Sequence, residues 1–100
     1  MKKHWELDEL IDHFTLIEPE KKLVESKYLN TQLGFAVLMK YFQLEARFPS
    51  KLTDIPKTVI DFIARQLRIP LDMYNHYSWN SRTMKNHRNE IRKLLLHLVF

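Results

Sequence analysis

The sequence predicts an all-α domain, a compact bundle of about six helices with a helix-turn-helix-like C-terminal half. Apolar residues recur every three to four positions along most of the chain, which is the spacing of one helix face. One glycine and four prolines are too few for the many tight turns of an all-β protein. The 100 residues, 45% of them hydrophobic, suffice for one core but leave no room for two domains.

The stretch 30–48 is expected to be the central helix. One apolar stripe consists of Leu33, Val37, Tyr41, Leu44 and Phe48, and a second of Phe35, Met39, Phe42 and Ala46. Only a narrow line stays mostly polar, and it contains Gln32, Lys40, Gln43 and Arg47. A helix that is apolar on most of its circumference must be covered on most sides. Asn30 is the expected N-cap, and Pro49 is expected to end the helix at Phe48.

Gly34 is the only glycine of the chain and falls inside this helix. Glycine there costs about 1 kcal/mol relative to alanine. We expect another helix to cross closely at this point, because only a residue without a side chain allows such an approach. The alternative is a tolerated glycine with no packing role.

Two short helices are expected before the central one. The first covers 5–14, and its buried stripe is expected to comprise Trp5 or Leu7, Leu10, Ile11 and Phe14. Its carboxylates fit a solvated face better than acid–base chemistry, because no partner motif accompanies them. The second begins near Pro19, which suits the first position of a helix, and ends near Lys27 before a turn.

Three helices in the C-terminal half have the proportions of a trihelical unit. They are expected at 56–67, 71–77 and 81–97, after a loop at 49–55. In the last helix, the residues expected to face inward are Met84, His87 or Arg88, Ile91, Leu95 and Leu98. Those expected to face outward are Arg82, Lys85, Asn86, Asn89, Arg92 and Lys93.

Basic residues are concentrated in this C-terminal half. The formal net charge of the chain is +4. Residues 1–54 carry 8 basic and 9 acidic side chains, whereas residues 55–100 carry 8 basic and only 3 acidic ones. Five basic residues between Arg82 and Lys93 stand against Glu90 alone. Such local basicity favours a surface that binds a polyanion over a general role in solubility.

The last helix is therefore the candidate DNA-binding element. In a trihelical unit, the N-terminal turns of the third helix meet base edges in the major groove, and residues further along meet phosphates. Arginine and asparagine suit bidentate contacts with guanine and adenine. The candidate residues are Asn80, Ser81, Arg82, Lys85, Asn86, Asn89, Arg92 and Lys93. A solvated surface or a protein-binding face is the alternative for a basic helix of this kind.

Other chemistries lack a complete set of residues, and we expect no catalytic site, metal or other cofactor, or small-molecule substrate. His87 and Glu90 have the spacing of some bundle metal sites, but the further carboxylates are missing. For Trp79, we favour a role as an anchor in the core over a role in stacking on a nucleobase. The absence of cysteine fits a reducing cytoplasm, and no apolar run reaches the length of a membrane span.

Several blocks of the sequence occur in the same order in a known protein family. They are Glu9-Leu10-Ile11 with His13-Phe14-Thr15, Leu33-Gly34-Phe35-Ala36-Val37, and Arg47-Phe48-Pro49. Further blocks are Pro56, Val59, Phe62-Ile63-Ala64-Arg65-Gln66-Leu67, Tyr77, Thr83, His87 and Glu90-Ile91-Arg92. Over nearly the whole chain, these blocks resemble the N-terminal domain of replicative transposases of the Tn-three family.

The resemblance implies a DNA-binding module of a longer, bacterial cytoplasmic transposase. Such a module recognises terminal inverted repeats for replicative DNA transposition, while a DDE-type domain elsewhere in the protein carries out strand transfer. Its expected partners are double-stranded DNA at the transposon ends and the remainder of the transposase. The C-terminal residues Leu96, Leu98 and Val99 depart from the family pattern. They favour the alternative function, a helical protein–protein docking or dimerisation module without direct base readout.

Overall fold

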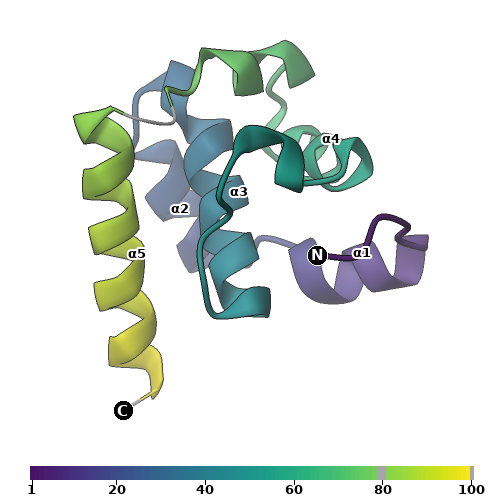
Figure 1. Cartoon of the computed structure of the whole chain (residues 1–100), viewed down its shortest axis with the longest axis horizontal. Coiled ribbons are helices and arrows are strands. Elements are labelled where there is room, and N and C mark those ends of the chain that lie inside the picture. The colour runs from purple at the N-terminus through teal and green to yellow at the C-terminus, as the bar shows by residue number, and fades with distance from the viewer. Residues whose placement is uncertain (79–80, 100) are drawn as a thin grey trace.

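The computed structural model describes the backbone of residues 1–78 and 81–99, and the side chains of 1–51, 53–78 and 81–95. The described chain contains five α-helices and two 3₁₀-helices (Figure 1). They are α1 (Leu7–Phe14), α2 (Glu18–Glu25), α3 (Leu29–Glu45), η1 (Leu52–Asp54), α4 (Lys57–Leu67), η2 (Leu71–His76) and α5 (Arg82–Val99). The radius of gyration of 12.5 Å is that of a compact chain of this length. The all-α prediction is confirmed.

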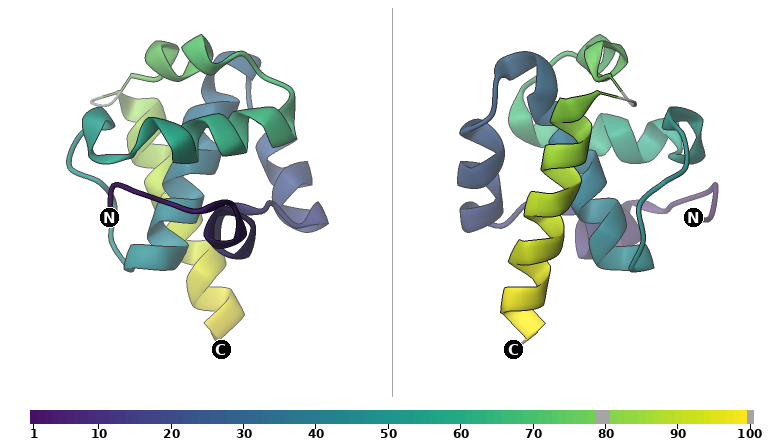
Figure 2. Two further views of the ribbon diagram at one scale, coloured as in Figure 1. Left: turned by 90° about the vertical axis from the view of Figure 1, so that its right-hand side faces the viewer. Right: turned by 60° about the vertical axis from the view of Figure 1, so that its left-hand side comes forward.

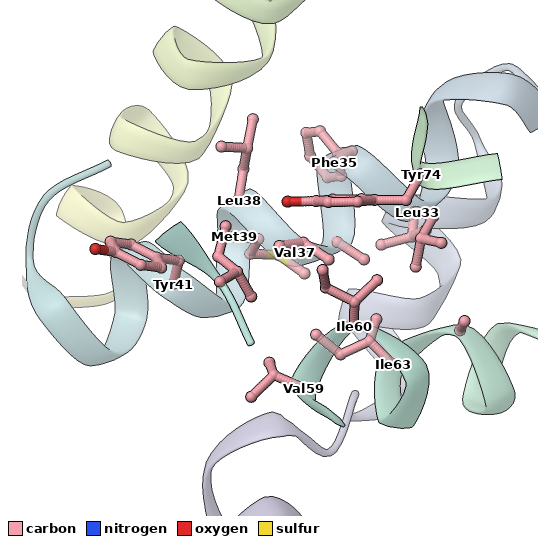
Figure 3. Close-up of a cluster of buried hydrophobic side chains, with 14 of the residues drawn as sticks. Leu33, Phe35, Val37, Leu38, Met39, Tyr41, Val59, Ile60, Ile63 and Tyr74 are labelled. Carbon is pink, nitrogen blue, oxygen red and sulfur yellow. The ribbon is translucent and has the colours of Figure 1, made fainter. Parts of the chain in front are cut away.

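Helix α3 is the centre of the fold, as predicted. All nine residues from Leu33 to Tyr41 are buried, because α1, α2, α4, η2 and α5 pack around this helix. Figure 3 shows Ile60 and Ile63 of α4 pointing toward Val37 of α3 within this core. A helix that is apolar on both stripes thus finds the cover that its sequence requires.

The ends of α3 differ from the prediction. The helix begins at Leu29, because Tyr28, with φ −59° and ψ 143°, lies outside the helical region and is the N-cap residue. Asn30 therefore lies within the first turn, is exposed, and is not the cap. At the other end, Ala46 adopts the left-handed conformation with φ 58° and closes the helix with an N–H bond to the Phe42 carbonyl. The helix thus ends three residues before Phe48, so Pro49 does not set its limit.

Gly34 does allow a close approach, but the neighbour is a side chain that follows η2, not a crossing α-helix. A Cβ atom built on Gly34 would lie 2.3 Å from the Cγ and Cδ1 atoms of Tyr77. Real Cβ atoms do not come so near another heavy atom, so an alanine here would force the Tyr77 ring to move. The glycine therefore has a packing role.

Helix α1 is less covered than predicted. Leu10 and Phe14 are buried, and the half-buried Trp5 meets the Phe14 ring edge-on with 4.9 Å between centroids. Leu7 and Ile11, in contrast, are 65% and 49% exposed. The prediction that Ile11 is buried was wrong, because this short helix contacts α3 and α4 only along its Leu10–Phe14 edge.

Two further expectations change in detail. The helix expected at 71–77 is the 3₁₀-helix η2, and the loop expected at 49–55 contains η1.

Lys40, expected in the polar line of α3, is only 5% exposed. Its ammonium lies 2.7 Å from the Glu20 carboxylate of α2, which also accepts a 2.5 Å bond from Gln43. Within the polar line of α3, Lys40 is thus covered and neutralised by α2, whereas Gln43 and Arg47 stay exposed.

Helix α5 packs along α3 at the side of the molecule, with its C-terminal turns extending past the other helices (Figures 1 and 2). Met84, His87 and Ile91 are buried, and Leu95 is half-buried. His87 rather than Arg88 is therefore the inward residue, while the Leu98 side chain lies outside the described residues. None of the described helices combines the length and apolar composition that a membrane span requires.

Candidate nucleic-acid interface

Ser81 forms the N-terminal cap of α5. Its hydroxyl accepts the Met84 N–H at 3.2 Å and donates to the Ser78 carbonyl at 2.8 Å. The Ser81 carbonyl accepts the Lys85 N–H at 3.3 Å, which completes the first turn. The predicted start of this helix is confirmed, and the hydroxyl of this candidate DNA-binding residue is used by the helix itself. Two further residues considered above, Trp79 and Asn80, lie outside the described residues.

The other candidate residues lie together on the outer face of α5, and all of them are exposed. They are Arg82, Lys85, Asn86, Asn89, Arg92 and Lys93. Four of them, Arg82, Asn86, Asn89 and Lys93, are three or four residues apart and form one stripe along successive turns. Beside the stripe, a shallow hollow of about 310 Å³ is lined by Lys85, Arg88, Asn89 and Arg92. The helix thus gathers its cations and amides on one side.

The charges of this outer face are not neutralised within the described part of the chain. Neither Arg82, Lys85 nor Lys93 forms an ion pair there. Arg92 donates to the Asn89 side-chain oxygen at 3.1 Å, and its guanidinium lies 5.1 Å from the centroid of the Phe48 ring. The one acidic residue of α5, Glu90, turns away and binds Lys27 instead. The outer face therefore keeps an uncompensated positive charge, which attracts polyanions.

Two contacts that the sequence did not indicate hold α5 in place. Lys27 follows α2, and its ammonium lies 2.6 and 2.8 Å from the two Glu90 carboxylate oxygens. The Tyr77 hydroxyl lies 2.7 Å from His87 Nδ1, and the two rings are stacked with 5.7 Å between centroids. Residues 27 and 90 are 63 positions apart, so no local pattern links them.

His87 is part of this anchor. Burial lowers the pKa of His87, the nearby Lys27 ammonium lowers it further, and the Glu90 carboxylate only partly opposes this shift. The neutral ring packs edge-on against Phe35 with 4.9 Å between centroids. Glu90, which has the spacing from His87 that some metal sites use, is bound by Lys27. No group of three or more metal-ligating side chains occurs among the described residues.

Comparisons with known proteins place the chain in a family. A transposase for transposon Tn3926 from Escherichia coli is 27% identical over 90 residues, which cover 85% of this chain and 9% of that protein. The chain therefore spans about a tenth of the length of this curated relative. No solved structure matches the chain. Residues 1–97 match the family described as a domain of unknown function, DUF4158, and the chain belongs to this family.

Proposed function

We propose that this chain is the DNA-binding module of a bacterial transposase and that it recognises the terminal inverted repeats of its transposon. The observation that carries the proposal is the exposed cationic face of α5, whose charges the described residues do not neutralise. The transposase relative supports the biological context. Strand transfer belongs to another part of the same transposase. The transposase acts in the cytoplasm.

The shape of α5 suits the major groove of DNA. The groove is about 12 Å wide and admits an α-helix. The segment from Arg82 to Lys93 spans about 17 Å at 1.5 Å per residue. When its N-terminal end lies in the major groove, its C-terminal end therefore reaches the phosphates that border the same groove. Because the opposite face of α5 packs on α3, its outer face can enter the groove without unfolding the core. In this pose Arg82 and Asn86 meet base edges, and Arg92 and Lys93 meet phosphates.

Fluorescence anisotropy with a duplex of the cognate transposon end and a scrambled duplex, over a salt series, tests this proposal. Arg82→Ala and Asn86→Ala are each expected to reduce the free energy of binding to the cognate duplex by about 1–3 kcal/mol. Binding to the scrambled duplex should be reduced much less. Arg92→Ala and Lys93→Ala should weaken binding to both duplexes alike. Each should also make the slope of log affinity against log salt concentration shallower by about one unit. Base contacts carry discrimination, whereas phosphate contacts carry only charge.

Arg65→Ala is the matched control, because Arg65 is an exposed cation on α4 that is paired with Asp61 at 2.9 Å. This variant should bind both duplexes like the parent. If the parent itself does not distinguish the cognate from the scrambled duplex, recognition of transposon ends by this chain is excluded. If all four α5 variants bind like the parent, α5 is not the DNA-contacting helix.

A second candidate function is a docking or dimerisation module without base readout. The C-terminal turns of α5 favour it, because they extend beyond the other helices and carry the apolar sequence Leu94-Leu95-Leu96 (Figure 1). Sedimentation equilibrium separates the two functions. A dimer that forms without DNA, together with equal affinity for both duplexes, would favour docking.

A further inference from the structure

The turn between α2 and α3 exposes two large apolar side chains. Tyr28 is 85% exposed and Leu29 is 62% exposed. Tyr28 is the N-cap residue of α3 and Leu29 its first residue, so both protrude from the start of the most buried helix. Exposed aromatic side chains at such a position offer contact area to a partner.

The backbone of this turn is tightly held. The Lys27 N–H donates to the Val24 carbonyl at 3.0 Å, and the Thr31 N–H and hydroxyl both donate to the Tyr28 carbonyl at 2.9 Å. The Gln32 side-chain amide donates to the Lys27 carbonyl at 3.0 Å. Tyr28 is therefore presented by a pre-organised turn, which reduces the entropy lost on binding.

The same turn is fixed next to the first turns of α5. The Lys27–Glu90 ion pair joins the two elements, and both lie at the same end of the molecule (Figure 2). A hollow of about 200 Å³ separates Tyr28 and Thr31 on one side from Thr83 and Asn86 on the other. Tyr28 thus flanks the part of α5 that is assigned to base contacts.

We propose that the Tyr28–Leu29 tip is a second DNA contact, and this inference rests on the proposed function. With α5 in the major groove, a sugar–phosphate strand borders the groove on the side of the hollow. The Tyr28 hydroxyl donates to a phosphate oxygen of that strand, and Leu29 packs against the adjacent deoxyribose. Tyrosine is among the side chains that donate to phosphates.

Charge and size favour DNA over a protein partner for this tip. The neighbouring face of α5 carries exposed cations that form no ion pair with the described residues, and these cations complement a phosphate strand. Two side chains offer far less than the roughly 800 Å² per partner that a standard protein interface buries. A backbone contact beside a major-groove helix needs only such a small surface.

Anisotropy with Tyr28→Ala, Tyr28→Phe and Leu29→Ala tests the inference, because these exposed side chains can be changed without disturbing the core. Tyr28→Ala should weaken binding to both duplexes about five- to tenfold, and Tyr28→Phe about half as much on a logarithmic scale. Leu29→Ala should weaken binding by a smaller factor. Because a phenol is uncharged, the salt slope should stay that of the parent, unlike the slope of Lys93→Ala.

Ile17→Ala is the matched control, since Ile17 is 59% exposed before α2 and does not line the hollow. It should bind like the parent, and all variants should melt like the parent. If the parent binds the cognate end and Tyr28→Ala binds equally well, the tip is not a DNA contact while the proposed function stands. If the parent binds no DNA, both proposals fail. If Tyr28→Ala loses self-association instead of DNA affinity, the tip is a protein interface.

Discussion

Helices α3 and α5 are nearly equal in length, 17 and 18 residues, but they differ in whether their cations are buried and paired. Lys40 of α3 is 5% exposed and paired with Glu20. The cations on the outer face of α5 meet solvent, and its single carboxylate, Glu90, is bound by Lys27 from outside the helix. A buried, paired lysine stabilises the fold, whereas exposed cations without an ion pair in the described part of the chain are available for a ligand. Stability and DNA binding should therefore separate on mutation.

The largest effect is expected from Lys40→Met. Removing the ammonium leaves Glu20, whose side chain is 12% exposed, without its ionic partner. Breaking a buried ion pair from one side costs about 3–5 kcal/mol, because a charge stays behind in a poorly solvated place. The free energy of unfolding, measured by urea titration, should fall by about this amount.

Two variants sharpen this comparison. Arg65→Met breaks an ion pair whose arginine is 81% exposed, and should cost less than about 0.5 kcal/mol. Lys93→Ala removes an exposed cation of α5 and should also change stability by less than about 0.5 kcal/mol. A loss of several kilocalories in Lys93→Ala would mean that the α5 cations serve the fold after all.

Gly34→Leu should have the next largest effect. The new side chain would occupy the space of the Tyr77 ring, which is itself held by the bond to His87. Overpacking of this kind costs about 1–3 kcal/mol, and the midpoint of thermal unfolding should fall accordingly.

The background Tyr77→Ala provides a control for this prediction, because alanine lacks the Cγ and Cδ atoms that a Cβ on Gly34 would meet. With the ring removed, adding Gly34→Ala should be far less harmful, because the Cβ no longer meets an aromatic ring. The double-mutant cycle should therefore show coupling between the two positions. Additive effects would show that the glycine matters for another reason.

The features of the fold that depend on periodicity could be predicted from the sequence. The two apolar stripes of α3 predicted its central place, and the spacing of Met84, His87 and Ile91 predicted the inner face of α5. The start of α5 near Ser81 was also predicted, because the 78–81 segment contains polar residues of the kind that precede helices. Each of these features is written in residues close together in the chain.

Features that depend on distant residues or unmarked backbone could not be predicted. Ala46 closes α3 in the left-handed conformation, although alanine gives no signal for it. Ile11 shares the apolar face of α1, but amphipathicity does not say how far a neighbour covers that face. The anchors of α5 join Lys27 to Glu90 across 63 positions. For the candidate site, the sequence therefore indicated the exposed face but not what positions it.

The anchors of the two helices should also respond to pH in separate ranges, which is the smallest effect expected. Burial raises the pKa of Glu20, but hydrogen bonds from Lys40, Gln43 and the Ile17 N–H outweigh it, so the pKa lies below its ordinary value of 4.5. Stability from this α3 contact is present above pH 4.5 and is lost only as the pH falls through the lowered pKa. Between pH 7.5 and 5, roughly, the α3 contact should therefore not titrate.

His87 at the α5 anchor should titrate within that range. Burial lowers its pKa from 6.5, so just below pH 6.5 the unfolded chain binds a proton that the folded chain does not. Stability is then fully present above pH 6.5 and decreases as the pH falls toward the lowered pKa, by at most about 1.4 kcal/mol per pH unit. Urea titrations of the parent and of His87→Gln, which keeps a polar partner for Tyr77, should diverge below pH 6.5. If Glu20→Gln rather than His87→Gln removes the pH dependence there, the anchor of α5 is not the group that titrates.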